Sequence, residues 1–301
     1  MAIKTGRYDC IAEVEIDRTK CISCGLCVKV CKGAPLYLDN GKIAIDQDRV
    51  FGCIGCGHCV AICPNDAIRV EGRDVSVGDF DEIPNDSATY KQLCALLAAR
   101  RSIREFTDKS IDDHIIEKIL EACTTAPMGM PPSDVEVLVL NGRHKVREFS
   151  SDMMTIIQRK KWLISPMMLR LYGLFAGKET MESLRSFIVP AVEAFTQSFE
   201  DGSDWLLYEA PLAMYFHSSP YSDPVDPVVT ATYAMIAAES LGLGSCMIGT
   251  IGYLLKLSGK QIKQKYGVSV RNQQGIMVIF GYPAIQYRRV IKRRLSNVHY
   301  Y

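Results

Sequence analysis

The sequence predicts an α+β protein of two domains, a small one rich in cysteine and a larger one in which buried strands are flanked by helices. Three observations support this prediction. The chain has 301 residues, which is about twice the usual length of one domain. Most of its 12 cysteines fall in two runs within residues 21–63. Beyond residue 90, helical patterns alternate with short apolar runs typical of buried strands.

Composition argues against several classes of partner. Lys and Arg number 35 against 34 Asp and Glu, a net charge of +1, so nothing indicates nucleic acid or an acidic membrane surface. The sequence has no uninterrupted apolar run long enough for a membrane span, and its first ten residues do not resemble a signal segment. We therefore expect a cytoplasmic protein whose partners are small molecules or other proteins.

Two runs of cysteines share the spacing C-x-x-C-x-x-C-x-x-x-C. They are Cys21, Cys24, Cys27 and Cys31, then Cys53, Cys56, Cys59 and Cys63. Three thiolates this close together on one loop can bind one 4Fe-4S cluster, and the fourth is left to point elsewhere. Zinc would need only four sulfurs per ion, and disulfides would need an oxidising compartment, so both alternatives are less favoured. The pattern predicts two 4Fe-4S clusters.

Short strands are predicted on either side of the cysteine runs. Residues 11–16 alternate between apolar and polar, as expected for a strand that enters the first loop, and residues 67–70 form a closing strand. Residues 36–38 and 43–45, separated by an Asn-Gly turn, predict a hairpin between the two runs.

This order of strands and cysteine loops over residues 8–72 resembles bacterial two-cluster ferredoxins. The resemblance implies that the fourth cysteine of each run crosses over to the other cluster. The implied ligand sets are Cys21, Cys24, Cys27 and Cys63 for one cluster, and Cys31, Cys53, Cys56 and Cys59 for the other. We expect this domain to span residues 1–72 and a linker to follow at 73–89, where no periodic pattern survives.

The larger domain, expected at residues 90–301, opens with a helical pattern that ends in a basic segment. Arg100, Arg101, Ser102 and Arg104 place three guanidinium groups and a hydroxyl around one turn. Such a set is suited to binding a phosphate group. A solvated helix end, whose dipole the arginines complement, is the alternative.

From about residue 92 onward the chain resembles the nitroreductase family of FMN-dependent flavoproteins. The resemblance rests on five motifs in order: RRSIREF at 100–106, APMGM at 126–130, LGLGSCMIG at 241–249, GYP at 281–283 and KRR at 292–294. It implies a mixed sheet flanked by helices and a homodimer with FMN at its interface. It also implies that the segment 241–249 is a helix-to-loop turn against the flavin ring.

The same resemblance implies which residues contact FMN. They are Arg100, Arg101, Ser102 and Arg104 at the phosphate, with Pro127, Met128, Gly129, Met130, Cys246, Ile248, Gly249, Lys292, Arg293 and Arg294. Two departures affect the mechanism. Pro131 and Ser133 stand where many relatives carry Asn and Gln, and Gly249 takes the place of a frequent acidic residue. The sequence therefore names no catalytic side chain and no proton donor, and backbone N–H groups are left for that role.

Buried strands are predicted at 135–140, 212–216 and 276–280, and a helix stopped by glycines at 228–243. A long helical insertion, at about residues 150–205, separates the first two strands and is rich in methionine. Its composition suits a lid that shapes a substrate site, since thioethers adapt to varied apolar ligands. Packing against a second subunit explains the composition equally well.

Together the two resemblances imply an oxidoreductase. Electrons from reduced ferredoxin or another low-potential donor would pass through two 4Fe-4S clusters to FMN, which would reduce an electron-poor small molecule by hydride transfer. Nitroaromatics, quinones and activated alkenes are the expected acceptors. No G-x-G-x-x-G segment precedes a helix, which argues against a dedicated nicotinamide site. Two alternatives stay open: a flavin reductase or electron-transfer partner without a fixed organic substrate, and a redox sensor.

Overall fold

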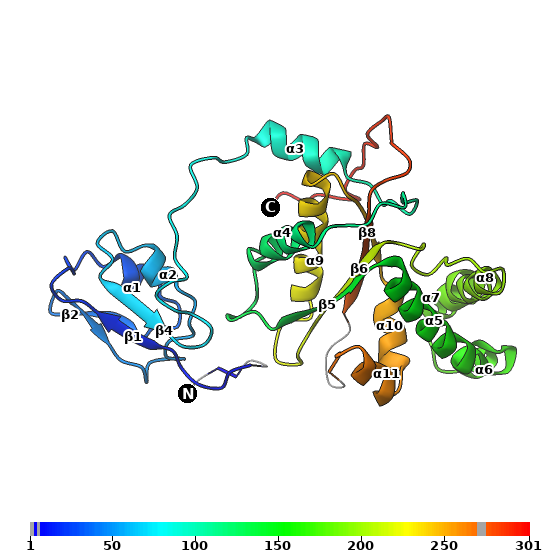
Figure 1. Cartoon of the computed structure of the whole chain (residues 1–301). Coiled ribbons are helices and arrows are strands. Elements are labelled where there is room, and N and C mark those ends of the chain that lie inside the picture. Colours follow the sequence, from blue (N-terminus) through cyan, green and yellow to red (C-terminus); the bar gives the residue numbers. More distant parts are fainter. Residues whose placement is uncertain (1–2, 5–6, 270–274) are drawn as a thin grey trace. The chain divides into compact units, whose positions relative to one another are not determined.

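The chain forms two compact units, each described by itself, in a computed structural model that describes residues 3–4, 7–269 and 275–301 (Figure 1). Unit 1 consists of Met1–Ser87, Pro127–Val135 and Ser218–Asp226. Unit 2 consists of Ala88–Ala126, Glu136–His217 and Pro227–Tyr301. Two segments of the larger predicted domain therefore group with the cysteine-rich residues.

The elements of unit 1 are short. They are β1 (Glu13–Ile16), α1 (Leu26–Val30), β2 (Leu36–Asp39), β3 (Lys42–Ile45), α2 (His58–Ala61) and β4 (Ile68–Glu71). Strand β1 pairs antiparallel with β4, and β2 pairs antiparallel with β3. The predicted outer strands and the hairpin between the cysteine runs are thus confirmed.

The hairpin turn follows from two residues in the left-handed region. Asn40 has φ 46° and Gly41 has φ 76°, and this pair favours the tight turn that matches the twist of a two-stranded ribbon. The small core of unit 1 lies between the strands and the cysteine loops, and its buried apolar residues are Ala12, Leu36, Ile43, Ile68 and Val70.

Unit 2 contains the larger sheet and most of the helices. Its elements up to the insertion are α3 (Tyr90–Ala99), α4 (Asp113–Thr124), β5 (Val135–Asn141) and α5 (Arg143–Lys160). The insertion continues with η1 (Lys161–Ile164), α6 (Pro166–Tyr172), α7 (Lys178–Ser183), η2 (Leu184–Ile188) and α8 (Val189–Glu200). The remaining elements are β6 (Leu212–Ser218), α9 (Asp226–Ser240), β7 (Gly244–Ile248), α10 (Thr250–Leu257), α11 (Lys260–Lys265) and β8 (Ile276–Gly281).

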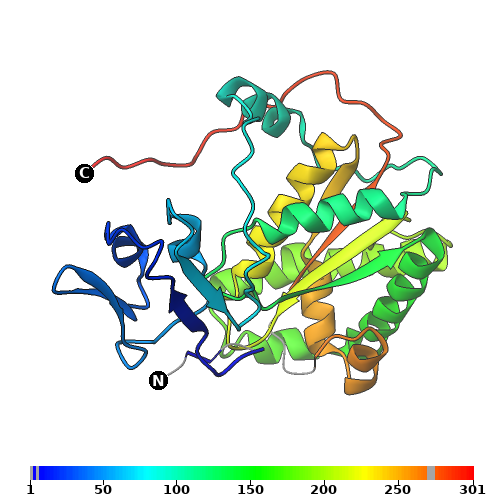
Figure 2. The same cartoon turned by 60° about the vertical axis from the view of Figure 1, so that its left-hand side comes forward.

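The four-stranded sheet of unit 2 has the order β5-β6-β8-β7, and β8 pairs antiparallel with both β6 and β7. Every residue of β6 is buried, as expected for a strand that is covered on both faces. Ala213 and Tyr215 pack in one core with α5 and α10. Successive strand residues alternate between faces, and helices α4 and α9 lie on the opposite side of the sheet (Figure 2).

The predicted α+β fold is confirmed, with one local correction. Residues 241–249 were expected to form a helix-to-loop turn, whereas the structure places strand β7 at Gly244–Ile248. A Cβ at Gly244 would lie 2.5 Å from the side chain of Ile103. The glycine therefore permits close packing within a strand, where the family resemblance had implied a turn.

The methionine-rich insertion is mostly helical, with turns near residues 173–177 and 201–205, and its methionines fall into two groups. Met153 and Met154 on α5 are 0% and 1% exposed and belong to the core of unit 2. Met167 on α6 is 74% exposed, and Phe175, which follows α6, is 86% exposed. Within the described ranges, no helix is long and apolar enough to cross a lipid bilayer.

Candidate functional site

Two pockets in unit 1 are each lined by four cysteines. Pocket I is lined by Cys21, Cys24, Cys27 and Cys63, and pocket II by Cys31, Cys53, Cys56 and Cys59. Each pocket thus takes three cysteines from one loop and the fourth from the other. This is the crossed grouping that the resemblance to two-cluster ferredoxins implies.

Glycines with positive φ shape both cysteine loops. Gly25 has φ 75° and precedes α1, and Gly57 has φ 73° and precedes α2, a conformation that side chains with a Cβ rarely adopt. A Cβ at Gly57 would also lie 2.9 Å from the ring of Phe80. The second loop is therefore packed against the chain that follows β4.

The chemistry of the donors fits iron-sulfur clusters. Burial raises the pKa of Cys27 and Cys53, and it raises the pKa of Cys59 to about 12. Binding of iron must therefore supply the free energy to deprotonate these thiols. In pocket I the backbone N–H of Ala67 donates to Cys63 Sγ at 3.3 Å, the kind of bond that stabilises a thiolate ligand.

A site for a single metal ion is the alternative to a cluster. Among the residues that the structure describes, no three His, Cys, Asp or Glu side chains lie close enough to bind one metal ion. Four thiols around a cavity instead suit a cluster in which each sulfur binds a different iron.

A buried arginine lies beside pocket II. Arg73 is 2% exposed, and its guanidinium donates to the carbonyl oxygens of Ile3 at 3.0 Å and Cys10 at 2.5 Å. A third bond reaches the carbonyl oxygen of Pro131, at 3.2 Å. Arg73 could not be predicted from the sequence, because a single arginine in a polar segment without periodicity carries no distinguishing signal.

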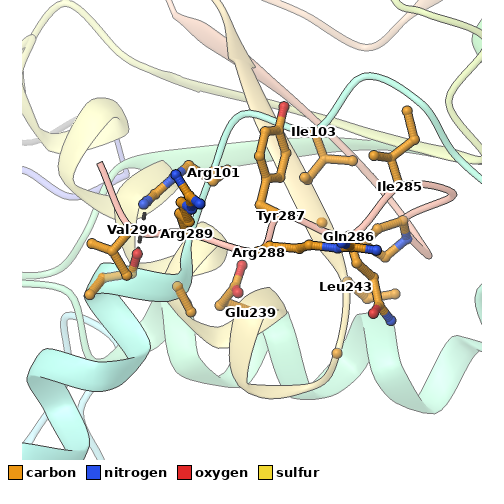
Figure 3. A pocket seen from close by; sticks show the side chains of 15 residues that line it. Arg101, Ile103, Glu239, Leu243, Ile285, Gln286, Tyr287, Arg288, Arg289 and Val290 are labelled. Carbon is orange, nitrogen blue, oxygen red and sulfur yellow. Dashed lines mark hydrogen bonds between the residues drawn. The ribbon is translucent and has the colours of Figure 1, made fainter. Parts of the chain in front are cut away.

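Unit 2 contains a basic pocket of about 390 Å³. Figure 3 shows the side chains around it, which come from the end of α3, the turn between α9 and β7, and residues 283–290 of the C-terminal segment. Arg101, Arg288 and Arg289 line it together with one carboxylate, Glu239. Burial raises the pKa of Glu239, an effect that the nearby charges of Arg100 and Arg101 oppose.

Arg101, which lines this pocket, has one N–H donor that makes no hydrogen bond. Its Nη1 donates to the carbonyl oxygens of Ala98 at 2.8 Å and Arg100 at 2.6 Å, whereas its Nε is buried without a hydrogen-bond partner. A buried donor without a partner costs free energy. An anionic group such as a phosphate therefore fits the residues present.

The other residues expected at the phosphate lie differently. Ser102 forms a β-bridge to Ser245 of β7, and Arg104 is exposed with its guanidinium 5.6 Å from the ring centre of Tyr208. Arg100 caps the end of α3. The late basic residues Lys292, Arg293 and Arg294 are exposed and do not line the pocket. The basic pocket is instead lined by Arg288 and Arg289, a few residues before Lys292. These two arginines were not predicted from the sequence.

The remaining expected flavin contacts are distributed over three places. Pro127, Met128, Gly129 and Met130 group with unit 1, where the N–H of Gly129 donates to the carboxylate of Asp226 at 3.0 Å. Cys246 and Ile248 are buried within β7. Gly249 lines a separate apolar pocket in unit 2.

This apolar pocket has a volume of about 410 Å³ and lies between α5, the insertion and α10. Its lining is aliphatic and aromatic, with Phe187, Phe195 and Tyr253 among the rings. Lys160 and Lys161 are its charged residues. The π-helix η2 forms part of the wall, and such turns often occur at functional sites.

Comparisons with known proteins agree with both units. The sequence model of the nitroreductase family matches residues 97–282, and the model of the 4Fe-4S dicluster domain matches residues 13–64. No curated protein matches the chain.

Several solved structures are similar to the larger part of the chain. A nitroreductase with bound FMN from Bacteroides fragilis is 18% identical, with 69% of this chain and 99% of that chain covered and a TM-score of 0.49. A nitroreductase with bound FMN from Desulfitobacterium hafniense is 20% identical, with coverages of 69% and 98% and a TM-score of 0.48. The NADPH:FMN oxidoreductase from Vibrio harveyi is 17% identical, with coverages of 69% and 76% and a TM-score of 0.44.

Proposed function

Because this chain belongs to the nitroreductase family and carries a 4Fe-4S dicluster domain, we propose that it is an FMN-dependent oxidoreductase that receives electrons through two 4Fe-4S clusters. The acceptor is an electron-poor small molecule, such as a nitroaromatic, a quinone or an activated alkene. The donor is reduced ferredoxin or another low-potential carrier.

The crossed arrangement of the eight cysteines carries this proposal. Each thiol pocket takes ligands from both loops, so neither cluster is held without the other loop. Two clusters in one small unit suit the transfer of single electrons at low potential. When bound, FMN supplies the hydride chemistry that clusters lack.

The basic pocket is the proposed site of the FMN phosphate. Arg101 offers its buried Nε there, and Arg288 and Arg289 add positive charge. Guanidinium groups bind phosphate oxygens through charge-assisted hydrogen bonds, which are stronger than neutral ones. The solved nitroreductases from Bacteroides fragilis and Desulfitobacterium hafniense contain bound FMN, which is consistent with the same cofactor here.

The apolar pocket is the proposed site of the acceptor. It is lined by Gly249, one of the residues expected at the flavin ring, and it is large enough for a small aromatic molecule. Aromatic and aliphatic walls favour a flat apolar acceptor over a sugar or an amino acid. Lys160 and Lys161 would attract acceptors that carry a negative group.

A homodimer is part of the proposal. The insertion exposes large apolar side chains, among them Met167, Leu174 and Phe175 at 74%, 74% and 86%. Such groups are unfavourable in water unless another surface covers them. A second copy of the chain would cover them and help to enclose the acceptor pocket.

Turnover under anaerobic conditions tests the function. The reconstituted protein is supplied with reduced ferredoxin, NADH or NADPH and with a nitroaromatic or a quinone, and the reduced product is quantified. We expect turnover with reduced ferredoxin and an electron-poor acceptor. Absence of turnover with every donor and acceptor, in protein that holds both FMN and clusters, would reject the enzyme and favour a redox sensor.

A further inference from the structure

Arg73 is a buried cation without a carboxylate partner. Among the described residues before position 88, it is the only charged residue that is buried, at 2% exposure. Its three hydrogen bonds go to backbone carbonyl oxygens, and its Nε has no partner. Within the described part of the chain it forms no ion pair. A buried guanidinium is expensive unless an opposite charge compensates it.

Pocket II, whose bound cluster would carry negative charge, lies close to Arg73. Gly55 lies between two of its ligands, Cys53 and Cys56, and a Cβ on Gly55 would lie 3.1 Å from Arg73 Cβ. The guanidinium of Arg73 bonds to the carbonyl oxygen of Cys10, and two residues further on the N–H of Ala12 donates to the carbonyl oxygen of Cys53 at 2.9 Å. Phe80 packs over Gly57 in the same loop. The segment that follows β4 therefore covers pocket II and brings a fixed positive charge to it.

Pocket I has no counterpart to Arg73. No charged side chain lines either pocket, and Arg73 is the only buried charged residue among those described before position 88. The comparable arginine is Arg18, which donates to the carbonyl oxygen of Ile43 at 2.6 Å but is exposed. Water and salt screen an exposed charge far more than a buried one. Two pockets with identical ligands thus differ in one buried charge.

We propose that Arg73 is a positioning residue that raises the reduction potential of the cluster in pocket II, so that this cluster is the first of the two to accept an electron. The inference rests on the proposed function, because it requires both clusters. Reduction transfers one electron from the external donor to the cluster, and no bond forms or breaks. The added negative charge is stabilised by a nearby fixed cation, most strongly where the dielectric is low.

Burial of the ligands acts in the opposite direction, because it disfavours a more negative cluster. It also differs between the two pockets: Cys53 and Cys59 are buried in pocket II, whereas in pocket I only Cys27 is buried and Cys24 is exposed. Burial alone therefore favours reduction of the cluster in pocket I first. The proposed order requires that the buried charge of Arg73 outweighs this effect.

Redox titration of the full-length, cluster-loaded protein, followed by electron paramagnetic resonance, tests the proposal. Arg73→Gln removes the charge, Arg73→Lys keeps it, and Arg18→Gln removes the matched exposed arginine. We expect Arg73→Gln to make reduction of the cluster in pocket II about tenfold less favourable. For a one-electron step this lowers the midpoint potential by about 59 mV. Arg73→Lys should keep a midpoint potential close to that of the wild type, and Arg18→Gln should leave both midpoint potentials unchanged.

The wild-type protein provides a second measurement that does not depend on the stability of a variant. Cysteine β-proton signals shifted by the paramagnetic clusters are assigned and followed during partial reduction. Signals of the pocket II ligands Cys31, Cys53, Cys56 and Cys59 should respond first. The reverse order, or unchanged midpoints in Arg73→Gln that retains both clusters, overturns the inference. A wild-type protein without 4Fe-4S clusters would instead reject the proposed function itself.

Discussion

At the scale of single residues, the proposed phosphate site depends on Arg101. We predict that Arg101→Ala weakens FMN binding, because a hydrogen bond to a charged group contributes about 1.5–3 kcal/mol. That loss corresponds to roughly a tenfold to hundredfold higher Kd. Isothermal titration of the apoprotein with FMN measures it.

The matched control for Arg101 is Arg170→Ala, which removes an exposed arginine on α6 that does not line the basic pocket. This variant should bind FMN as the wild type does. Full FMN affinity in a folded Arg101→Ala protein would move the phosphate site elsewhere, and Arg293 and Arg294 would be the next residues to test.

His217 predicts a dependence of stability on pH. It is 2% exposed on β6, and burial lowers its pKa, an effect that Glu136 opposes. The folded state therefore favours the neutral ring. The protein keeps its full stability above the ordinary histidine pKa of about 6.5. It loses stability as pH falls below that value, because the unfolded chain binds a proton that the buried ring resists. The free energy of unfolding should fall by at most about 1.4 kcal/mol per pH unit for this group.

Denaturant unfolding at pH 7 and pH 5 measures this effect. His217→Gln should reduce the loss of stability at the lower pH, whereas His114→Gln, which changes an exposed histidine on α4, should not. An equal loss in wild type and His217→Gln would show that another group titrates.

At the scale of elements, helix α5 and helix α6 use their methionines differently. We predict that Met153→Ala destabilises unit 2 by about 2–5 kcal/mol, because it opens a cavity in the core. Met167→Ala should change the free energy of unfolding by less than about 0.5 kcal/mol, since the side chain is 74% exposed. Comparable losses in the two variants, measured by denaturant unfolding, would contradict this division.

Most elements could be predicted because their signals are local. The apolar runs that became β5, β6 and β8, and the Asn-Gly turn between β2 and β3, carry their periodicity or turn chemistry in the sequence itself. Strand β7 was not predicted, because it begins with Gly244. A glycine is needed there because the side chain of Ile103, from a distant segment, packs against its backbone. Such a tertiary contact leaves no periodic signal.

The same distinction holds for the sites. Cysteine spacing is sufficient to predict ligands, because three thiolates on one loop are a local pattern. The role of Arg73 depends on carbonyl groups from Ile3, Cys10 and Pro131, and that of Arg288 on the fold of the C-terminal segment toward α3. The roles of these residues can be recognised only in the folded structure, where segments distant in the sequence contact one another.

At the scale of the whole molecule, the central claim is that the clusters are the route by which electrons reach FMN. The most direct measurement is rapid anaerobic mixing of the protein with reduced ferredoxin, with flavin reduction followed by absorbance. Cys56→Ser removes a ligand of pocket II and leaves the basic pocket untouched. Cys94→Ser, which changes a cysteine outside both runs, is the control. We predict that Cys56→Ser retains FMN and its reduction by dithionite but loses rapid reduction by ferredoxin, and flavin reduction by ferredoxin at the wild-type rate in this variant would contradict the account.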